Sequence, residues 1–280
     1  MYAWNGRVQL HYLLSGNEAA PPLLLIQGLT RPAAHWGDFC DALSPHFRLV
    51  TLDNRGVGKS GTPLPPYTTR QMAEDALAVL DAARVESAHV FGMSLGGMIA
   101  QELTLLAPAR VRRLVLGCTR ASRRAGVPMS LSALAAFAVA GALSPDAAMA
   151  HIAPFILSSK FMKTRPEVLE AWQRTALEDP PRRLGVFGQV AAALAHDSRQ
   201  RLSRIRHPTL IVTGDADRLI SPECSRFLQR AVAGSQLEVL PGAGHEFHIE
   251  APEATTRALR RFLLDETETK GNERVTTPAA

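Results

Sequence analysis

The chain has 280 residues, of which 46% are hydrophobic and 20% charged, and its formal net charge is +5. This balance is ordinary for a soluble globular protein, and the arginines form no long basic run, so we expect no nucleic-acid partner. The N-terminus has no apolar core of signal-peptide length, and the longest weakly polar stretch, 131–143, is too short to span a bilayer. We therefore predict a cytoplasmic protein without a membrane partner, and the oligomeric state stays open.

Metal and cofactor sites are not indicated by the sequence. The three cysteines, Cys40, Cys118 and Cys224, lie far apart without CxxC spacing, which favours buried reduced thiols over disulfides or metal ligands. The nine histidines show no HExxH spacing, and the chain has no Walker loop. Residues 92–97 lack Gly-x-Gly-x-x-Gly spacing, and no second strand ending in an acidic residue supports dinucleotide binding. We predict that the protein uses neither a metal nor a cofactor.

The first part of the chain alternates between strand and helix patterns. Asn5-Gly6 predicts a β-hairpin, and 23–26 is apolar at every position, as in a strand buried on both faces. Further strands are predicted at 47–52, 88–91 and 111–116, and helices at 36–43, 69–84 and from 98 onward. The alternation predicts a right-handed, mainly parallel sheet with helices on both faces.

The pattern changes after residue 119. Residues 120–206 show little strand signal, and alanine-rich helical segments broken by prolines predict an inserted helical cap. Strand and helix patterns resume at 208–212, 222–232, 237–240 and 254–264. We expect one core built from 1–119 and 207–265, the cap between them, and a disordered polar tail at 266–280.

The sequence around Ser94 predicts a reactive serine. Ser94 stands in the motif Gly-x-Ser-x-Gly, after an apolar strand pattern and before a helical one. At such a junction the turn is so tight that Gly92 and Gly96 must lack side chains, and the serine hydroxyl is exposed beside the helix N-terminus. A glycine-rich connection without chemistry is the alternative, because the motif also occurs by chance.

A general base and an acid for this serine stand after two later strands. A serine hydroxyl needs a base to take its proton, and the base needs an orienting acid. The segment after the strand at 208–212 carries Asp215 and Asp217, and the segment after the last strand carries His245. The carboxyl ends of parallel strands converge at one edge, so these side chains are expected to meet Ser94 there.

Four motifs together resemble the α/β-hydrolase family: GMSLGG (92–97), DNRGVGKS (53–60), GDADRLISP (214–222) and GAGHEFHIEAPE (242–253). The order serine, aspartate, histidine is also that of this family. The resemblance implies an α/β-hydrolase fold with an inserted helical cap. It implies that Ser94 is the nucleophile, His245 the general base and then acid, and Asp217 the orienting carboxylate. Asp215 is the alternative acid and His248 the alternative base.

The resemblance also implies an oxyanion hole made by two backbone amides, those of Leu95 and Leu29. The family usually has His-Gly in the loop before the second donor, whereas this chain has Gln27-Gly28. A backbone donor survives this change, so catalysis is not put in doubt, although loop support and substrate preference are. Gly28 and Trp36, on and just behind this loop, are the predicted substrate contacts.

The predicted activity is hydrolysis of a small carboxylic ester or lactone through an acyl-enzyme. The first half of the chain looks similar to 3-oxoadipate enol-lactonases and related esterases. The same triad also serves carbon–carbon bond hydrolases and cofactor-free haloperoxidases, and these remain alternatives. A slow or non-catalytic small-ligand sensor, and a scaffold acting through the apolar segment 131–143, are alternatives of another class. Dehalogenases and epoxide hydrolases of this fold need an aspartate where this chain has Ser94.

Overall fold

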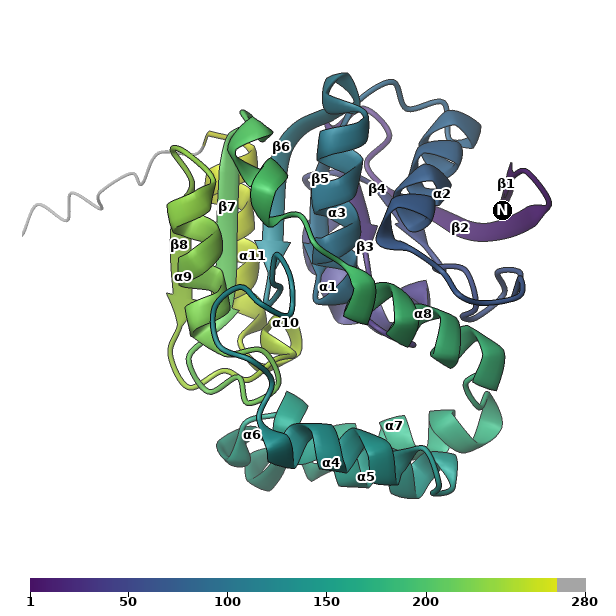
Figure 1. The fold of residues 1–280 in the computed structure, drawn as a ribbon. Helices are drawn as coiled ribbons and strands as arrows, with labels where there is room; N and C mark the ends of the chain where they lie inside the picture. Colours follow the sequence, from purple (N-terminus) through teal and green to yellow (C-terminus); the bar gives the residue numbers. More distant parts are fainter. Residues whose placement is uncertain (266–280) are drawn as a thin grey trace, which may run out of the picture.

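A sheet of eight strands, in the order β1-β2-β4-β3-β5-β6-β7-β8, runs through the part of the chain that the computed structural model describes, residues 1–265 (Figure 1). Strand β2 pairs antiparallel with β1 and β4, and the remaining pairs are parallel. The strands are β1 Tyr2–Asn5, β2 Val8–Gly16, β3 Pro22–Ile26, β4 Arg48–Leu52, β5 Ala88–Met93, β6 Val111–Gly117, β7 Thr209–Gly214 and β8 Gln236–Leu240. The predicted hairpin and mainly parallel sheet are confirmed. The predicted disordered tail, 266–280, lies outside the described residues.

Helices cover both faces of the sheet, as the alternating pattern predicts (Figure 1). In β3, Leu24 and Ile26 belong to one hydrophobic core, whereas Leu23 and Leu25 belong to a second core on the opposite face. This is the two-residue period of a strand buried on both sides. The first core includes residues of α2 (Thr69–Ala82) and α3 (Leu95–Leu106), and the second includes residues of α1 (Asp38–Leu43) and α11 (Pro252–Leu263).

Local sequence signals account for the helix boundaries. Thr68 and Gln71 form a capping box, in which each side chain accepts a hydrogen bond from the other residue's backbone amide. Helix α2 starts at Thr69, directly after the capping residue Thr68. The single helix predicted at 36–43 is instead a short 3-10 helix, Ala33–Trp36, followed by α1. Gly37, with φ of 45°, separates the two because glycine tolerates a positive φ that ends a regular helix.

The segment between β6 and β7 is helical, as predicted, and forms a layer beside the carboxyl edge of the sheet (Figure 1). Its helices are α4 Leu131–Ala140, α5 Pro145–Ile156, α6 Ser159–Thr164, α7 Pro166–Glu178 and α8 Arg183–Ala195. Helix α8 lies against the core, where Gly185 meets Gly56 so closely that a Cβ on either would overlap the other backbone. After the segment come α9 Pro222–Ala231 and the short α10 Phe247–Glu250. Among residues 1–265, no helix has the length and apolar character needed to cross a membrane.

Candidate active site

Ser94 occupies a sharp turn between β5 and α3. Its backbone has φ of 55° and ψ of −117°, a conformation that side-chain-bearing residues rarely adopt. A Cβ on Gly92 would overlap the carbonyl oxygen of Gly96, and a Cβ on Gly96 would overlap that of Ile26. The turn is held from β6, because the Ser94 amide donates to the Gly117 carbonyl at 2.9 Å. The predicted need for glycine at 92 and 96 follows directly from these close approaches.

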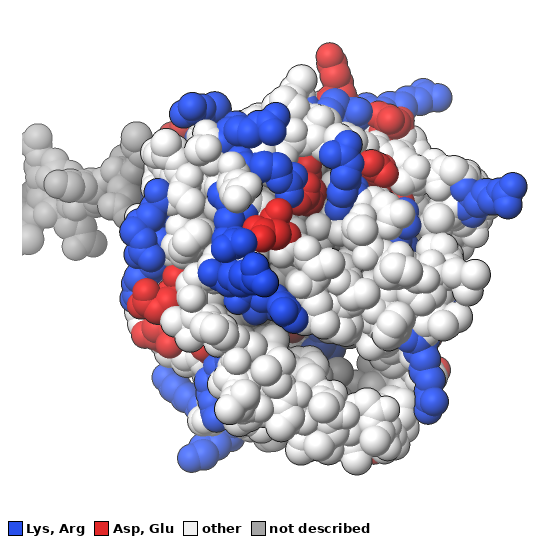
Figure 2. Space-filling view, in the orientation of Figure 1, with Lys and Arg blue, Asp and Glu red and all other residues white. Residues whose placement is uncertain are grey.

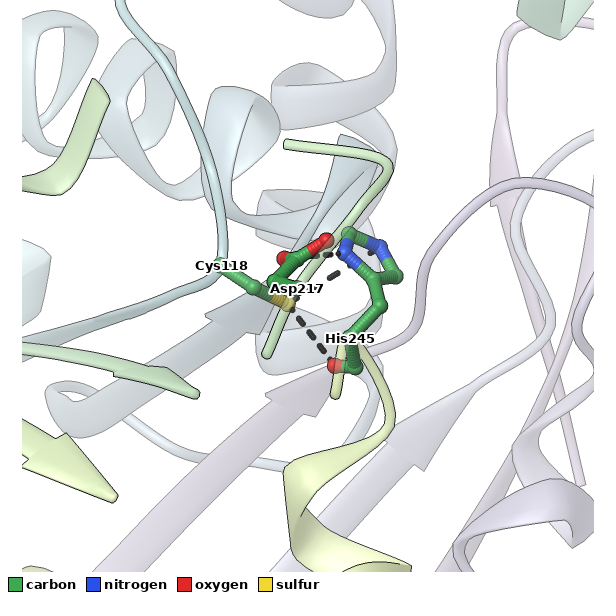
Figure 3. Close-up of side chains that lie close together, drawn as sticks. All are labelled: Cys118, Asp217 and His245. Atoms are coloured by element: carbon green, nitrogen blue, oxygen red, sulfur yellow. Dashed lines mark hydrogen bonds and ion pairs between the residues drawn. The ribbon is translucent and has the colours of Figure 1, made fainter. Parts of the chain in front are cut away.

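Asp217 and His245 form a buried pair at the ends of β7 and β8 (Figure 3). Nδ1 of His245 lies 2.7 Å from Oδ2 of Asp217, and the side chains are 5% and 0% exposed. The other carboxylate oxygen of Asp217 accepts hydrogen bonds from the amides of Leu219 and Ile220, at 2.8 and 2.9 Å. Both oxygens of Asp217 are therefore engaged, and the imidazole is held by Nδ1, while Nε2 has only a weak contact, to Sγ of Cys118 at 3.8 Å.

The pKa of His245 is raised by its neighbour Asp217. Burial disfavours the imidazolium, but the charge of Asp217 and its hydrogen bond outweigh burial, so the pKa of His245 lies well above its ordinary value. Cys118, at the end of β6, packs on the imidazole with Sγ 3.8 Å from Nε2, and its thiol donates to the His245 carbonyl at 3.2 Å. Burial raises the pKa of Cys118 to about 11, so the sulfur is a neutral thiol at neutral pH. We therefore attribute the raised pKa of His245 to Asp217.

Ser94 and His245 line the same small cavity, of about 70 Å³, with Gly28 and Leu29 of the loop after β3. Among the described residues, no hydrogen bond joins the Ser94 hydroxyl to the imidazole. Such a bond is often long in an unliganded enzyme and shortens when substrate binds. The structure thus brings Ser94 and His245 to one cavity and pairs His245 directly with Asp217.

Two backbone amides, one in the loop that lines this cavity and one next to Ser94, have no acceptor within residues 1–265. The amide of Leu95 is the first of α3, and that of Leu29 lies in the loop after β3; within residues 1–265 neither donates a hydrogen bond. The neighbouring Gly28 amide donates to its neighbour's side chain, Gln27 Oε1, at 3.0 Å. A Cβ on Gly28 would lie 3.1 Å from the Ser94 Cβ, so this loop packs on the turn that carries Ser94. The amides predicted to form an oxyanion hole are thus available as donors.

The cap helix α8 holds this loop in place. Oε1 of Gln189 accepts a hydrogen bond from the Thr30 amide at 2.8 Å, and Nε2 donates to the Arg55 carbonyl at 2.9 Å. Gln189 is fully buried. In place of the family's histidine, Gln27 leaves its Nε2 buried without a partner, while the Asn54 side chain donates to the Gln27 carbonyl at 3.0 Å. The loop is therefore supported by Gln189 and Asn54.

A second, larger cavity of about 720 Å³ adjoins the small one. Thr30, Arg31 and Met149 line both, whereas Ser94 and His245 line only the small one. The larger cavity lies between α7 and the segment around Trp36, and Figure 2 shows the molecule hollowed between the cap and the rest of the chain. The reacting group of a substrate fits the small cavity, and the remainder of the molecule fits the larger one.

The structure separates the alternative site residues from the main ones. Asp215 accepts a hydrogen bond from the Gly242 amide at 2.6 Å, a loop-bracing role. The side chain of His248 is fully buried, and its ring lies 5.1 Å from that of Trp36; burial lowers its pKa to about 4. Trp36 is 1% exposed, stacks with Phe39, and lines the larger cavity only. A substrate contact by Trp36 stays a prediction, as does one by Gly28.

Sequence reasoning missed a group of buried polar residues beside the small cavity. It comprises Arg31, His35 and Glu246, together with His248. The one sequence signal for them is that two of them stand next to predicted site residues: Arg31 is two residues beyond Leu29, and Glu246 directly follows His245. The contacts among them depend on tertiary structure, since Arg31 and Glu246 are 215 positions apart (246 − 31).

Three side chains near the small cavity carry atoms of the types that bind metal ions. Cys118, Asp217 and His245 each offer one atom, and these lie within 4.8 Å of one another. Asp217 already accepts from two amides and the imidazole, and the thiol is neutral, whereas a metal needs a thiolate. The residues present therefore fit an internal hydrogen-bonded pair better than a metal site. The expectation of no metal and no cofactor stays a prediction.

The fold and the serine turn define a class of protein, the α/β hydrolases. The family model described as "alpha/beta hydrolase fold" matches residues 21–252. The chain belongs to this family, and it is a hydrolase. The resemblance stated on sequence motifs and the predicted fold class are confirmed.

Similar proteins within the family act on several substrates. The chain is 30% identical over 266 residues to a putative carbamate hydrolase, RutD, of Azorhizobium caulinodans, covering 93% of this chain and 97% of that protein. It is 28% identical to 3-oxoadipate enol-lactonase 2 of Acinetobacter baylyi, covering 91% and 93%. The crystal structure of an enol-lactonase from Burkholderia xenovorans matches with a TM-score of 0.84 at 27% identity, covering 94% and 100%.

Proposed function

We propose that this protein is a serine hydrolase that cleaves a small carboxylic ester or lactone through an acyl-enzyme on Ser94. Asp217 orients His245, which acts as general base and then as general acid. The amides of Leu29 and Leu95 form the oxyanion hole. The protein needs no metal or cofactor for this chemistry.

One observation carries this proposal: the 2.7 Å Asp217–His245 pair opens onto the same 70 Å³ cavity as Ser94. The imidazole has Nδ1 occupied by the acid, so Nε2 is the atom that takes the serine proton. The amides of Leu29 and Leu95, which donate no hydrogen bond within residues 1–265, are the proposed donors to the negative charge that develops on the carbonyl oxygen. A nucleophile, an oriented base and two oxyanion donors are the groups that acyl transfer requires.

The reaction has two halves. In the first, Ser94 Oγ attacks the carbonyl carbon while His245 takes its proton, and the leaving oxygen departs with that proton as the carbon–oxygen bond breaks. In the second, His245 takes a proton from water, the resulting hydroxide attacks the acyl-enzyme, and Ser94 leaves with the proton from His245. For a lactone the leaving hydroxyl stays attached to the acyl chain, and the product is one hydroxy acid or its keto form.

The names of the relatives and the cavity sizes support the proposed substrate class. The relatives above are named for lactone and carbamate hydrolysis, which both proceed by attack on a carbonyl carbon. A cavity of about 70 Å³ at Ser94 admits the reacting group, and one of about 720 Å³ beside it admits a small organic molecule.

The test is hydrolysis of a chain-length series of p-nitrophenyl esters by wild type and Ser94→Ala. We expect kcat to fall at least about 10³-fold in the variant, because the remaining groups cannot form an acyl-enzyme. Ser203→Ala, at an exposed serine, is the matched control and keeps wild-type rates. A fluorophosphonate probe provides a second measurement: its adduct maps to Ser94 by mass spectrometry.

Ester hydrolysis that persists in Ser94→Ala contradicts the proposal. If wild type hydrolyses no ester but the probe still labels Ser94, carbon–carbon substrates and haloperoxidase activity are tested next. If the probe does not label Ser94 either, the sensor alternative is favoured over the enzyme with this mechanism.

A further inference from the structure

Arg31 is a buried cation with few partners. Its side chain is 13% exposed, and the structure gives it one ion-pair neighbour, Oε1 of Glu246, at 3.7 Å from Nε. Nη2 points to the sulfur of Met149 at 3.7 Å. Within residues 1–265, no oxygen accepts a hydrogen bond from the guanidinium. A guanidinium has five N–H donors, so a buried one with no oxygen acceptor is incomplete as a structural salt bridge.

The orientation of Arg31 is nevertheless well defined. Its Cζ lies 4.5 Å from the ring centre of Trp172 on α7, a cation–π arrangement that holds the flat face of the guanidinium. The ring of His35 in turn lies 4.9 Å from that of Trp172. A guanidinium stacked on an aromatic face keeps its N–H edge available, and that edge fits the two oxygens of a carboxylate.

Glu246 favours the charged form of Arg31 but accepts no hydrogen bond from it. Glu246 is its nearest anion, and Glu246 Oε2 is buried without a hydrogen-bond partner. Burial lowers the pKa of Arg31, and the Glu246 charge opposes that effect. His35 and His248, near Glu246 at 4.0 and 3.6 Å, have their pKa values lowered by burial, so both are neutral at neutral pH. The local charge facing the cavity is therefore that of one arginine backed by one carboxylate.

Arg31 stands where a substrate must pass. It lines the small cavity with Ser94 and also the larger cavity. Among the described residues lining the small cavity, it is the sole lysine or arginine, and the other walls are largely apolar: Met93, Phe137, Met149, Ile152, Ile156 and Leu219. Glu246 also lines the small cavity, and His245, with its raised pKa, is the one other residue of that lining that can carry a positive charge. Arg165 and Arg182 line the larger cavity only, so Arg31 is the arginine that shares a cavity with Ser94.

We propose that Arg31 binds a carboxylate of the substrate, so that the preferred ester or lactone carries a negative charge a few carbon atoms from the scissile carbonyl. This inference rests on the proposed function of Ser94, and it names the substrate class more narrowly. Arg31 acts as a specificity-determining residue: its N–H edge pairs with the substrate carboxylate while Glu246 and Trp172 hold the guanidinium in place.

The experiment compares two p-nitrophenyl esters of equal acyl length, the glutarate monoester and the valerate ester, after subtraction of spontaneous hydrolysis. The readout is the ratio of their kcat/KM values, anionic over neutral. We expect the ratio to fall about 10- to 100-fold in Arg31→Met and less in Arg31→Lys, which keeps the charge but not the fork. Arg70→Met removes an exposed arginine that pairs with Glu74, and it controls for net charge alone.

A second arm reads binding without turnover. Monomethyl glutarate and methyl valerate are titrated by calorimetry into Ser94→Ala and into Ser94→Ala/Arg31→Met. Tighter binding of the anion, lost with Arg31, supports the inference. Equal binding of both ligands, or a parallel loss of both on removing Arg31, overturns it. Because this arm needs no hydrolysis, it decides the inference even when the ester assays go against the proposed role of Ser94.

Discussion

The side-chain oxygen of Gln189, on cap helix α8, accepts a hydrogen bond from the Thr30 amide at 2.8 Å. Thr30 follows Leu29 in the loop that carries the candidate oxyanion donor. The other end of the same side chain donates to the Arg55 carbonyl at 2.9 Å. The cap therefore does more than cover the cavity, because one of its residues fixes the position of the loop that carries a proposed oxyanion donor.

Gln189→Leu is expected to lower both activity and stability. The substitution leaves the Thr30 amide and the Arg55 carbonyl without partners, which lowers the free energy of unfolding by about 2 kcal/mol. We expect kcat to fall about 10-fold with a smaller change in KM, because a shifted oxyanion donor acts mainly in the transition state. Ester kinetics and urea denaturation measure the two effects. Gln229→Leu, at an exposed position of α9, is the control. An unchanged kcat in Gln189→Leu would contradict the proposal that Gln189 holds the loop of Leu29 and Thr30 in place.

The pH dependence of kcat/KM reports the state of His245. Its pKa is raised above the ordinary value of 6.5, so the base form grows in as pH rises and the acid limb of the profile lies above pH 6.5. Asp217→Asn removes the charge that raises this pKa and leaves burial, which lowers it. The limb should then move to lower pH, while kcat falls about 10³- to 10⁴-fold. A limb that stays in place in Asp217→Asn means that another group titrates.

Relief of backbone strain at Ser94 should raise stability. A residue other than glycine at φ of 55° and ψ of −117° costs about 1–3 kcal/mol. Glycine relieves this strain but loses about 0.5–1 kcal/mol through its more flexible unfolded chain. Ser94→Gly is therefore expected to be more stable than Ser94→Ala in urea denaturation, with both variants inactive. A Ser94→Gly variant that is less stable than Ser94→Ala by about 0.5–1 kcal/mol would show that the turn carries no strain.

The carboxylate of Asp53, directly after β4, holds together the segments around Ala33 and Lys59. Its carboxylate accepts from the amides of Ala33 and Lys59, at 2.6 and 2.9 Å, and lies 2.9 Å from Nδ1 of His11. Asp53→Ala leaves these donors buried and unpaired, so the free energy of unfolding should fall by about 3 kcal/mol. Urea denaturation measures it, and Asp41→Ala, at an exposed aspartate of α1, should change stability by less than about 0.5 kcal/mol. A loss at Asp53 no larger than that at Asp41 would exclude the bracing role.

Most of the fold could be predicted from the sequence because its signals are local. The run at 23–26 is apolar at every position, and β3 is buried on both faces. The start of α2 at Thr69 follows from the capping box of Thr68 and Gln71. The helix at 36–43 was predicted as one piece, since a single glycine inside an apolar pattern does not reveal that its φ is positive.

The candidate triad was also accessible from the sequence, for a different reason. Parallel strands end at one edge, so Ser94, Asp217 and His245 can be placed together by topology alone, although 151 positions (245 − 94) separate the first from the last. The 2.7 Å Asp217–His245 pair agrees with that placement. The choice between Asp217 and Asp215 needed the resemblance to the family, and in the structure Asp215 instead braces Gly242.

The sequence by itself determined the order of strands and helices, the serine turn, and the strand ends that carry the candidate acid and base. These depend on neighbouring residues, on glycine at tight contacts and on the two-residue period of strands. The tertiary structure alone decided which side chains surround the cavity: Gln189 on Thr30, Trp172 under Arg31, and Glu246 beside it. Such contacts join residues far apart in the chain, and packing of the cap on the core selects them, so no local pattern encodes them.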